Sequence, residues 1–199
     1  MSKFCSEADK FQFPSVCVYP CYVKQVVDLL NSKNPKVCTV IDFPNGSTTS
    51  KTKLYGALEA VENGASELDV MVNLTYIKTG QAKQLHREIA EISEETGKTV
   101  KAILEMALLT EEEKRLVIEV LMDAGVAFFV TNTGWYGGAT LTDVKLLREI
   151  TKTNVGIKAA GGIKTYQQAA NLILAGATRL GTSRGVELLK QQNTQSELE

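Results

Sequence analysis

The sequence predicts an α/β fold in which parallel strands alternate with covering helices, and two patterns indicate this. Short runs rich in β-branched residues recur along the chain, and longer amphipathic stretches separate them. The repeat takes roughly 25 residues, which is typical of strand–helix units joined by right-handed crossovers. Seven such units within 199 residues favour a barrel over an open sheet.

Each expected strand is short and apolar, as is typical of a sheet whose outer face is covered by helices. The seven strand-like runs are residues 15–18, 37–41, 67–72, 100–105, 127–132, 155–160 and 179–183. The helices expected after them cover residues 22–32, 50–63, 81–96, 110–124, 141–150, 165–175 and 184–191.

Helix boundaries carry recognisable signals. Gly64, Gly97 and Gly125 follow the expected ends of three helices, where glycine commonly takes the left-handed conformation. Thr110 and Glu113 predict a capping box, in which each side chain accepts a hydrogen bond from the other residue's backbone N–H. These signals support the helix positions given above.

A complete barrel of the TIM (β/α)8 type needs eight strands and typically about 250 residues. The chain offers seven strand–helix units, because residues 1–11 have the pattern of a helix and not of a strand. We therefore expect a TIM (β/α)8-type barrel whose N-terminal first strand is missing, as a single domain over residues 1–191. Residues 192–199 are polar and are expected to form a C-terminal tail.

Composition argues against several classes of function. A formal net charge of −1 gives no electrostatic reason to expect nucleic acid or an acidic membrane surface as a partner. No apolar run approaches the roughly 20 residues that a membrane-spanning helix needs. The N-terminus is polar and lacks the apolar core of a signal peptide, so a cytoplasmic location is expected.

The four cysteines, Cys5, Cys17, Cys21 and Cys38, are expected to be reduced structural thiols. Cys17 and Cys38 lie in apolar strand-like runs, where a buried free cysteine behaves as a small hydrophobic residue. The spacing from Cys17 to Cys21 differs from the two-residue gap of redox and zinc motifs. We expect neither a metal nor a cofactor.

Alternation along the expected strands predicts a charged interior. Asp69 on the third strand, Lys101 and Glu105 on the fourth and Lys158 on the sixth lie on faces opposite to fully apolar ones. If the apolar faces pack against helices, these four charged side chains point into the barrel. Enclosed opposite charges offset one another's desolvation and shift one another's pKa, so we expect a polar centre suited to chemistry.

Glycine-rich turns follow the last three strands. They are residues 133–138, 161–162 and 181–185. Such turns present backbone N–H groups to anions, and barrels commonly bind phosphate at the carboxyl ends of their last strands. Arg184 would add a charge-assisted contact, so the pattern predicts a phosphate site.

Eight short motifs follow one another over residues 1–189. They are Val-Cys-Val-Tyr-Pro at 16–20, Val-Cys-Thr-Val-Ile at 37–41, Glu-Leu-Asp-Val at 67–70, Val-Lys-Ala-Ile-Leu-Glu at 100–105, Thr-Asn-Thr-Gly at 131–134, Gly-Gly-Ala-Thr at 137–140, Gly-Ile-Lys-Ala-Ala-Gly-Gly-Ile at 156–163 and Gly-Thr-Ser at 181–183. In this order they resemble the deoxyribose-phosphate aldolases. The resemblance implies a TIM barrel and a reversible, metal-free aldol reaction through a lysine Schiff base. That reaction joins acetaldehyde and glyceraldehyde 3-phosphate into 2-deoxyribose 5-phosphate, so a small phosphorylated sugar or aldehyde is the implied partner, and self-association is left open.

The resemblance also implies roles for individual residues. Asp69 matches the carboxylate of the proton relay, and Lys158 matches the second lysine, whose charge lowers the pKa of the nucleophilic one. Positions around the phosphate are matched by Gly134, Gly161, Gly162, Gly181 and Ser183, to which we add Arg184. The supporting polar interior would be formed by Lys101, Glu105, Thr131 and Thr133.

One departure from the family pattern bears directly on activity. The family's Schiff-base lysine stands directly before Thr-Ser-Thr-Gly, whereas here Val130 precedes Thr131-Asn-Thr-Gly134. Valine has no amine and forms no imine, so family-type activity is expected to be absent or very low. The family's opening strand, with its Asp-His-Thr signature, has no counterpart before Met1.

Three interpretations follow. The chain is a non-catalytic homologue that still binds a sugar phosphate, or an active aldolase that uses Lys158 as nucleophile. In the third interpretation it is an interaction protein whose open barrel is completed by a partner, because unpaired strand edges invite pairing. Coding sequence upstream of Met1 is a further source of the missing strand, but it would not restore a lysine at position 130.

Overall fold

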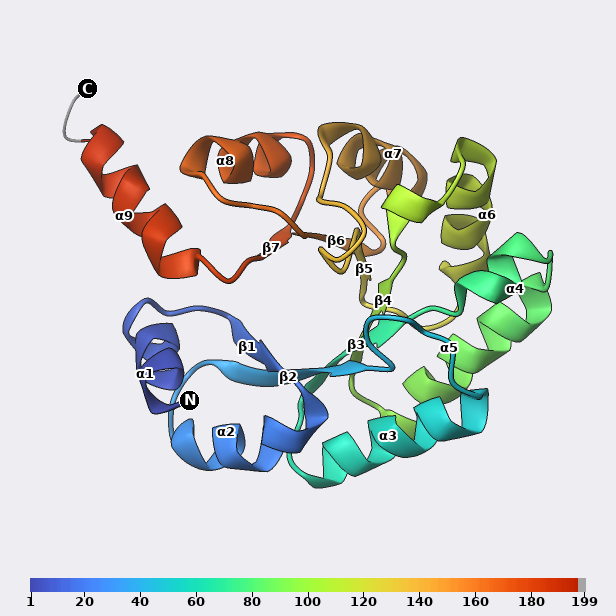
Figure 1. Ribbon diagram of the computed structural model, residues 1–199, viewed down its shortest axis with the longest axis horizontal. Coiled ribbons are helices and arrows are strands. Elements are labelled where there is room, and N and C mark those ends of the chain that lie inside the picture. Colours follow the sequence, from blue (N-terminus) through green and yellow to red (C-terminus); the bar gives the residue numbers. More distant parts are fainter. Residues whose placement is uncertain (197–199) are drawn as a thin grey trace. The chain divides into compact units, whose positions relative to one another are not determined.

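The computed structural model describes residues 1–196 and contains seven strands with helices between them (Figure 1). The strands follow the order of the chain, β1 to β7, which confirms the predicted alternation. The chain divides into two compact units. Unit 1 comprises residues 1–102 and 120–127, and unit 2 comprises residues 103–119 and those from 128 onward.

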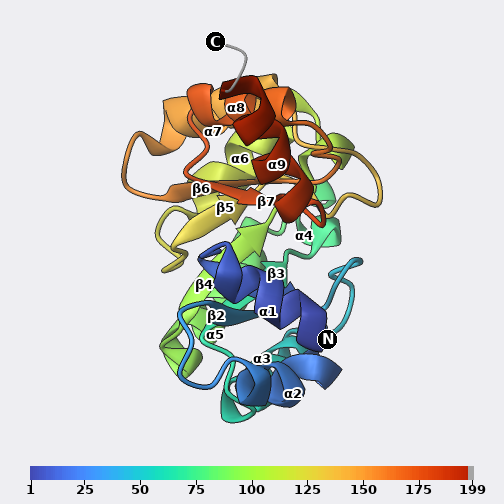
Figure 2. The same cartoon turned by 90° about the vertical axis from the view of Figure 1, so that its left-hand side faces the viewer.

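Unit 1 holds the first strands and their helices. These are α1 (Ser2–Lys10), β1 (Ser15–Val18), the 3-10 helix η1 (Pro20–Tyr22), α2 (Val23–Leu29), β2 (Lys36–Ile41), α3 (Ser50–Glu62), β3 (Glu67–Met71), α4 (Leu74–Lys78), α5 (Ala82–Thr96) and most of β4 (Thr99–Ile103). Strands β1, β2 and β3 pair in parallel, with Cys17 opposite Cys38 and Cys38 opposite Glu67. Helix α1 packs against α2 and β1, and α3 packs against α5 (Figure 2).

Unit 2 holds the remaining elements. These are η2 (Met106–Leu108), most of α6 (Glu111–Leu121), β5 (Phe128–Val130), α7 (Leu141–Thr151), β6 (Gly156–Ala160), α8 (Tyr166–Leu174), β7 (Arg179–Gly181) and α9 (Gly185–Ser196). Strands β5, β6 and β7 pair in parallel, with Val130 opposite Lys158 and Lys158 opposite Arg179. Helices α7 and α8 pack against each other over these strands, and α9 packs on α8 (Figures 1 and 2).

Alternate residues of the strands form an apolar layer against the helices. In unit 1 this layer includes Leu68 and Val70, and in unit 2 it includes Phe129, Ile157 and Ala159, all fully buried. Burying one large apolar side chain contributes about 1.5–3 kcal/mol, so this layer stabilises each unit and turns the other strand face inward. Within the described residues, every helix falls short of the length and apolar character that a membrane crossing requires.

The predicted helix signals are confirmed where they were most specific. The backbone N–H of Thr110 donates to Glu113 Oε2 at 2.8 Å, and the backbone N–H of Glu113 donates to Thr110 Oγ1 at 3.2 Å. This is the predicted capping box at the start of α6. Gly97 ends α5 in the left-handed conformation, with φ of 57°.

Several predicted boundaries were wrong for local reasons. The helix expected over 22–32 begins as the 3-10 turn η1 at Pro20 and ends as α2 at Leu29. The short helix α4 was not predicted; the side chain of Asn73 caps it by accepting from the backbone N–H of Thr75 at 3.0 Å.

The end of β4 and the C-terminal tail also differ from prediction. Strand β4 ends at Ile103 because Glu105 has a φ of 49°, a left-handed conformation that a regular strand cannot contain. Helix α9 continues to Ser196, so the tail expected from residue 192 is helical over 192–196. Residues 197–199 lie outside the described part, and the single domain expected over 1–191 stays a prediction.

Candidate active site

A cluster of buried polar side chains lies on the inward face of the strands in unit 1. Lys101 Nζ lies 2.8 Å from Asp69 Oδ1 and 2.8 Å from Glu67 Oε2. The Cys38 thiol donates to Asp69 Oδ1 at 3.2 Å and accepts from Lys101 Nζ at 3.3 Å. The structure brings Asp69 and Lys101 together, as alternation predicts, and adds Glu67 and Cys38, which sequence reasoning missed.

The protonation states in this cluster follow from its charges. Burial alone would lower the pKa of Lys101, but the charge of Asp69 and the hydrogen bonds to Asp69 and Glu67 raise it above the ordinary value. The hydrogen bond with Cys17, burial and the charge of Asp69 raise the pKa of Cys38 well above its ordinary value. Lys101 is therefore an ammonium at neutral pH and a poor nucleophile, and Cys38 is a thiol.

The cysteines only partly match their predicted role. All four cysteines are free in the structure, whereas their burial differs. Cys17 is exposed, so its interpretation as a buried apolar residue is wrong, whereas Cys38 is buried. The Cys17, Cys38 and Asp69 ligand atoms lie within 4.8 Å of one another, which the sequence spacing did not predict.

A second buried ion network fixes the turn that follows β2. Lys53 Nζ lies 2.6 Å from Glu88 Oε1 and 3.5 Å from Asp42 Oδ2, and it donates to the carbonyl oxygens of Met71 at 2.8 Å and Gly46 at 3.4 Å. Asp42 has a φ of 55°, a conformation that favours glycine. The network positions the backbone of the turn and offers no exposed reactive group.

In unit 2, Val130 and Lys158 are opposite each other on neighbouring parallel strands. Their side chains therefore leave the strands on the same face, opposite to the layer that packs against the helices. Val130 is 2% exposed and Lys158 is 6% exposed. A Cβ atom on Gly181 would lie 3.0 Å from Lys158 Cε, so the glycine leaves room for the lysine side chain.

Hydrogen bonds to backbone groups hold the polar side chains that lie just before and after β5. Glu105 Oε2 accepts from the backbone N–H of Thr133 at 3.0 Å, while its buried Oε1 accepts no hydrogen bond from any described residue. Thr131 Oγ1 donates to the carbonyl of Ala160 at 3.0 Å and accepts from its N–H at 3.0 Å. Asn132 Oδ1 accepts from the N–H of Ala107 at 3.0 Å. Glu105, Thr131 and Asn132 thus brace the carboxyl ends of β5 and β6.

The glycine turns after β5 and β6 pack directly against each other. Gly134 and Gly161 have φ values of 90° and 95°, and a Cβ atom on Gly161 would lie 3.1 Å from Gly134 Cα. Thr182 Oγ1 donates to the carbonyl of Ile163 at 3.0 Å, which ties the turn after β7 to the turn after β6. The predicted phosphate-site glycines therefore gather at one end of unit 2.

The other predicted phosphate residues lie at the surface. Ser183 and Arg184 are exposed, directly before α9 begins at Gly185. The guanidinium of Arg184 lies 3.7 Å from Glu187 Oε2, and its backbone N–H donates to Thr182 Oγ1 at 3.0 Å. A ligand would compete with Glu187 for this side chain.

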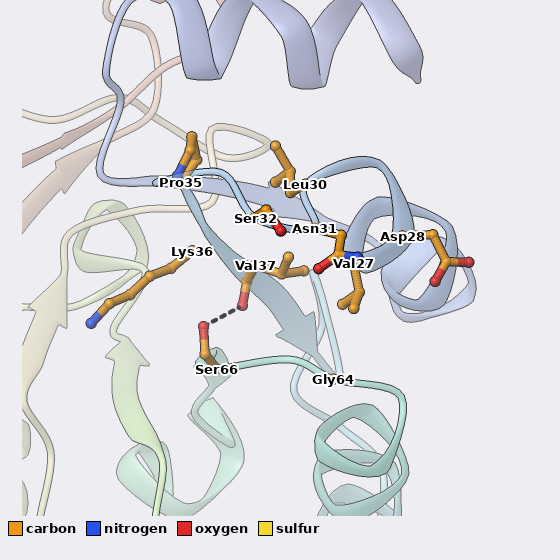
Figure 3. Close-up of a pocket in the computed structure, with 10 residues that line it drawn as sticks. All are labelled: Val27, Asp28, Leu30, Asn31, Ser32, Pro35, Lys36, Val37, Gly64 and Ser66. Atoms are coloured by element: carbon orange, nitrogen blue, oxygen red, sulfur yellow. Dashed lines mark hydrogen bonds between the residues drawn. The ribbon is translucent and has the colours of Figure 1, made fainter.

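One pocket lies away from the predicted site residues, and another lies beside the predicted phosphate-site glycines. A pocket of about 510 Å³ in unit 1 is lined by α2, the start of β2 and the segment from Gly64 to Ser66 (Figure 3). It lies at the amino end of β2, whereas barrels carry their chemistry at the carboxyl ends of strands, so we do not assign it to the site. A smaller pocket of about 140 Å³ in unit 2 is lined by Gly161, Gly162 and Ile163.

Comparison with known proteins places this geometry in a family. Residues 1–192 match the model of the DeoC/LacD family aldolases. The chain belongs to this aldolase family. It is 59% identical over 199 residues to the deoxyribose-phosphate aldolase of Trichormus variabilis, covering 100% of this chain and 88% of that protein. It is 60% identical over 192 residues to the deoxyribose-phosphate aldolase of Microcystis aeruginosa, covering 96% and 85%.

Solved aldolase structures share the fold. The structure described as QR15, an aldolase, matches with a TM-score of 0.93 and 35% identity, covering 99% of this chain and 89% of the other. The deoxyribose phosphate aldolase from Aeropyrum pernix, described as tetrameric, matches with a TM-score of 0.90 and 30% identity, covering 98% and 83%. These likenesses confirm the predicted TIM-type fold class for the aldolase chain.

Proposed function

We propose that this aldolase-family chain binds a small phosphorylated sugar or aldehyde but has lost the amine that forms the Schiff base. The observation that carries the proposal is Val130, which is buried on the inward face beside Lys158, at the position that the resemblance assigns to the nucleophilic lysine. Imine formation requires a primary amine to attack the aldehyde carbon, with loss of water, and valine supplies no nitrogen.

The remaining site is suited to ligand binding. The turns with Gly134, Gly161 and Gly162 take conformations that present backbone N–H groups, and α9 begins just after Ser183 and Arg184. Such turns and helix N-termini favour phosphate oxygens.

A specific observation favours a second candidate function. Lys158 is a buried amine on the strand next to Val130 and on the same face, so an aldolase that uses Lys158 as its nucleophile is the alternative. The strands are about 4.8 Å apart, and an error of about 1 Å in placing a reacting group can cost on the order of 100-fold in rate. Such an enzyme would therefore turn over slowly.

Two measurements on the full chain separate these functions. Calorimetric titration with 2-deoxyribose 5-phosphate should give saturable binding, and borohydride with acetaldehyde should trap no adduct. An adduct that peptide mapping places on Lys158, and that Lys158→Ala abolishes, would establish the second function. Absence of binding in the titration would contradict the first.

Self-association and a cytoplasmic location also belong to this proposal. A homologous aldolase from Aeropyrum pernix is described as tetrameric, which supports assembly of this chain by analogy. Light scattering of the purified chain should give a mass above the 21.7 kDa of the monomer. A monomer at all concentrations tested would contradict the assembly.

A further inference from the structure

Three potential metal ligands meet on neighbouring strands of unit 1. Cys17 comes from β1, Cys38 from β2 and Asp69 from β3, and their ligand atoms lie within 4.8 Å of one another. We propose that these three residues form a binding site for a thiophilic divalent cation, with Zn²⁺ as the fitting ion. The inference goes beyond the aldolase reaction and does not depend on it.

The spacing of the donor atoms matches a tetrahedral site. Zinc binds sulfur at about 2.3 Å and carboxylate oxygen at about 2.0–2.2 Å, so neighbouring ligand atoms around it lie about 3.5–3.8 Å apart. Asp69 Oδ1 lies 3.2 Å from Cys38 Sγ, and Asp69 Oδ2 lies 3.8 Å from Cys17 Sγ. The two contacts involve different oxygens of Asp69, and the set with one ligand atom per residue lies within 4.8 Å of one another, so side-chain adjustments of up to about 1 Å would close the site around the ion.

The strand register keeps the two thiols in place. Cys17 and Cys38 are paired Cα positions of adjacent parallel strands, so both side chains lie on the same face. Asp69 and Cys38 are buried, whereas Cys17 is exposed. An ion can therefore enter at Cys17 and displace the thiol protons, while a water molecule completes the fourth position.

The chemistry of the donors selects the class of ion. Two sulfur ligands favour zinc and other thiophilic cations over magnesium and calcium, which prefer oxygen. Two thiolates, one carboxylate and one divalent cation together carry a single negative charge. Lys101 already donates to Cys38 Sγ at 3.3 Å and to Asp69 Oδ1 at 2.8 Å, so its ammonium offsets that charge from outside the ligand shell.

Binding should depend strongly on pH. Both cysteines must lose a proton to become ligands, so each bound ion releases up to two protons.

Cobalt titration of the reduced full chain tests the site. Co²⁺ in a site with thiolate ligands gives an intense sulfur-to-metal charge-transfer absorption, and Zn²⁺ should displace it at one ion per chain. Cys17→Ser and Cys38→Ser should each weaken Zn²⁺ binding by at least tenfold and reduce the charge-transfer intensity. The matched controls Cys5→Ser and Cys21→Ser remove the other two thiols. They should leave the Zn²⁺ affinity and the charge-transfer intensity unchanged.

Cys17→Ser is the decisive variant, because its side chain is exposed and its fold can be checked by circular dichroism. The proposal is overturned if Cys17→Ser binds Zn²⁺ as tightly as Cys21→Ser, or if the reduced wild type gives no charge-transfer band. A phosphine reductant keeps the thiols free, and the intact mass confirms that no Cys17–Cys38 disulfide has formed.

Discussion

Replacing Val130 by lysine tests whether the inward face of unit 2 can still support imine chemistry. Val130 and Lys158 are opposite each other in parallel register, so a lysine at 130 would point to the same side as Lys158. Neighbouring strands are about 4.8 Å apart, so two lysine side chains that extend in parallel would hold their amines about 5 Å from each other.

The size of the expected pKa shift follows from the distance between the two amines. At about 5 Å and an effective dielectric constant of about 20, two positive charges repel by about 3 kcal/mol. The repulsion lowers the pKa of the introduced amine and favours its neutral, nucleophilic form by more than about 100-fold. The longer side chain at Val130 should cost about 1–3 kcal/mol of stability through overpacking, which a folded chain can tolerate.

The assay is borohydride trapping of an acetaldehyde imine as a function of pH, with the adduct located by peptide mass mapping. Val130→Lys should form an adduct on residue 130 near neutral pH. In Val130→Lys combined with Lys158→Met, the pH profile should move upward, because the neighbouring charge is gone. Coincident profiles, or an adduct on Lys158 in the single variant, would refute the reasoning, provided that circular dichroism shows both variants folded.

Three further predictions concern stability. Lys101→Met leaves its carboxylate partners buried without that ammonium and should lower the free energy of unfolding by about 3–5 kcal/mol in urea titrations, whereas the exposed control Lys51→Met should change little. The pKa of Lys101 is raised in the folded state, so its contribution to the free energy of unfolding is complete below the unfolded value of about 10.4 and is lost as pH rises above it. The wild type should therefore lose stability above about pH 10 more steeply than Lys101→Met does. Equal slopes of stability against pH for the two proteins would contradict this. Gly161→Ala should cost about 1–3 kcal/mol in thermal unfolding, because its φ is 95° and the new Cβ would lie 3.0 Å from a carbonyl oxygen. Gly80→Ala, at a φ of 70° in open space, should cost less, and an equal loss would show that crowding adds nothing at Gly161.

Regular strands explain why part of the site could be predicted from sequence. Asp69 and Lys101 lie in β3 and β4, where period-two alternation holds, so their shared inward face followed directly. The same alternation also applied to Glu67, two residues before Asp69, and should have marked it as a partner of Lys101. Glu105 shows the limit, because its left-handed backbone breaks the alternation and its carboxylate is held by the backbone of Thr133.

Contacts between helices that are far apart in the sequence leave no signal in the local sequence pattern. Lys53 and Glu88 are 35 residues apart and fit the polar stripes of two helices, so the sequence gives no reason to expect them fully buried. Cys38 likewise fits an apolar run, and only the packing of three strands shows that it meets Asp69 and Lys101. The sequence pattern of a strand or helix predicts which face a residue occupies. Which other residue it contacts on that face depends on tertiary packing.

The Lys53 network has a consequence for how the aldolase chain tolerates change. One amine bonds the turn at Gly46, the end of β3 at Met71 and helix α5 at Glu88. Losing that amine would loosen three segments together, whereas Ser47 and Thr48 on the outer surface of the turn are exposed. Sequence drift and engineered insertions should therefore be accepted on the outside of this turn and rejected at the lysine beneath it.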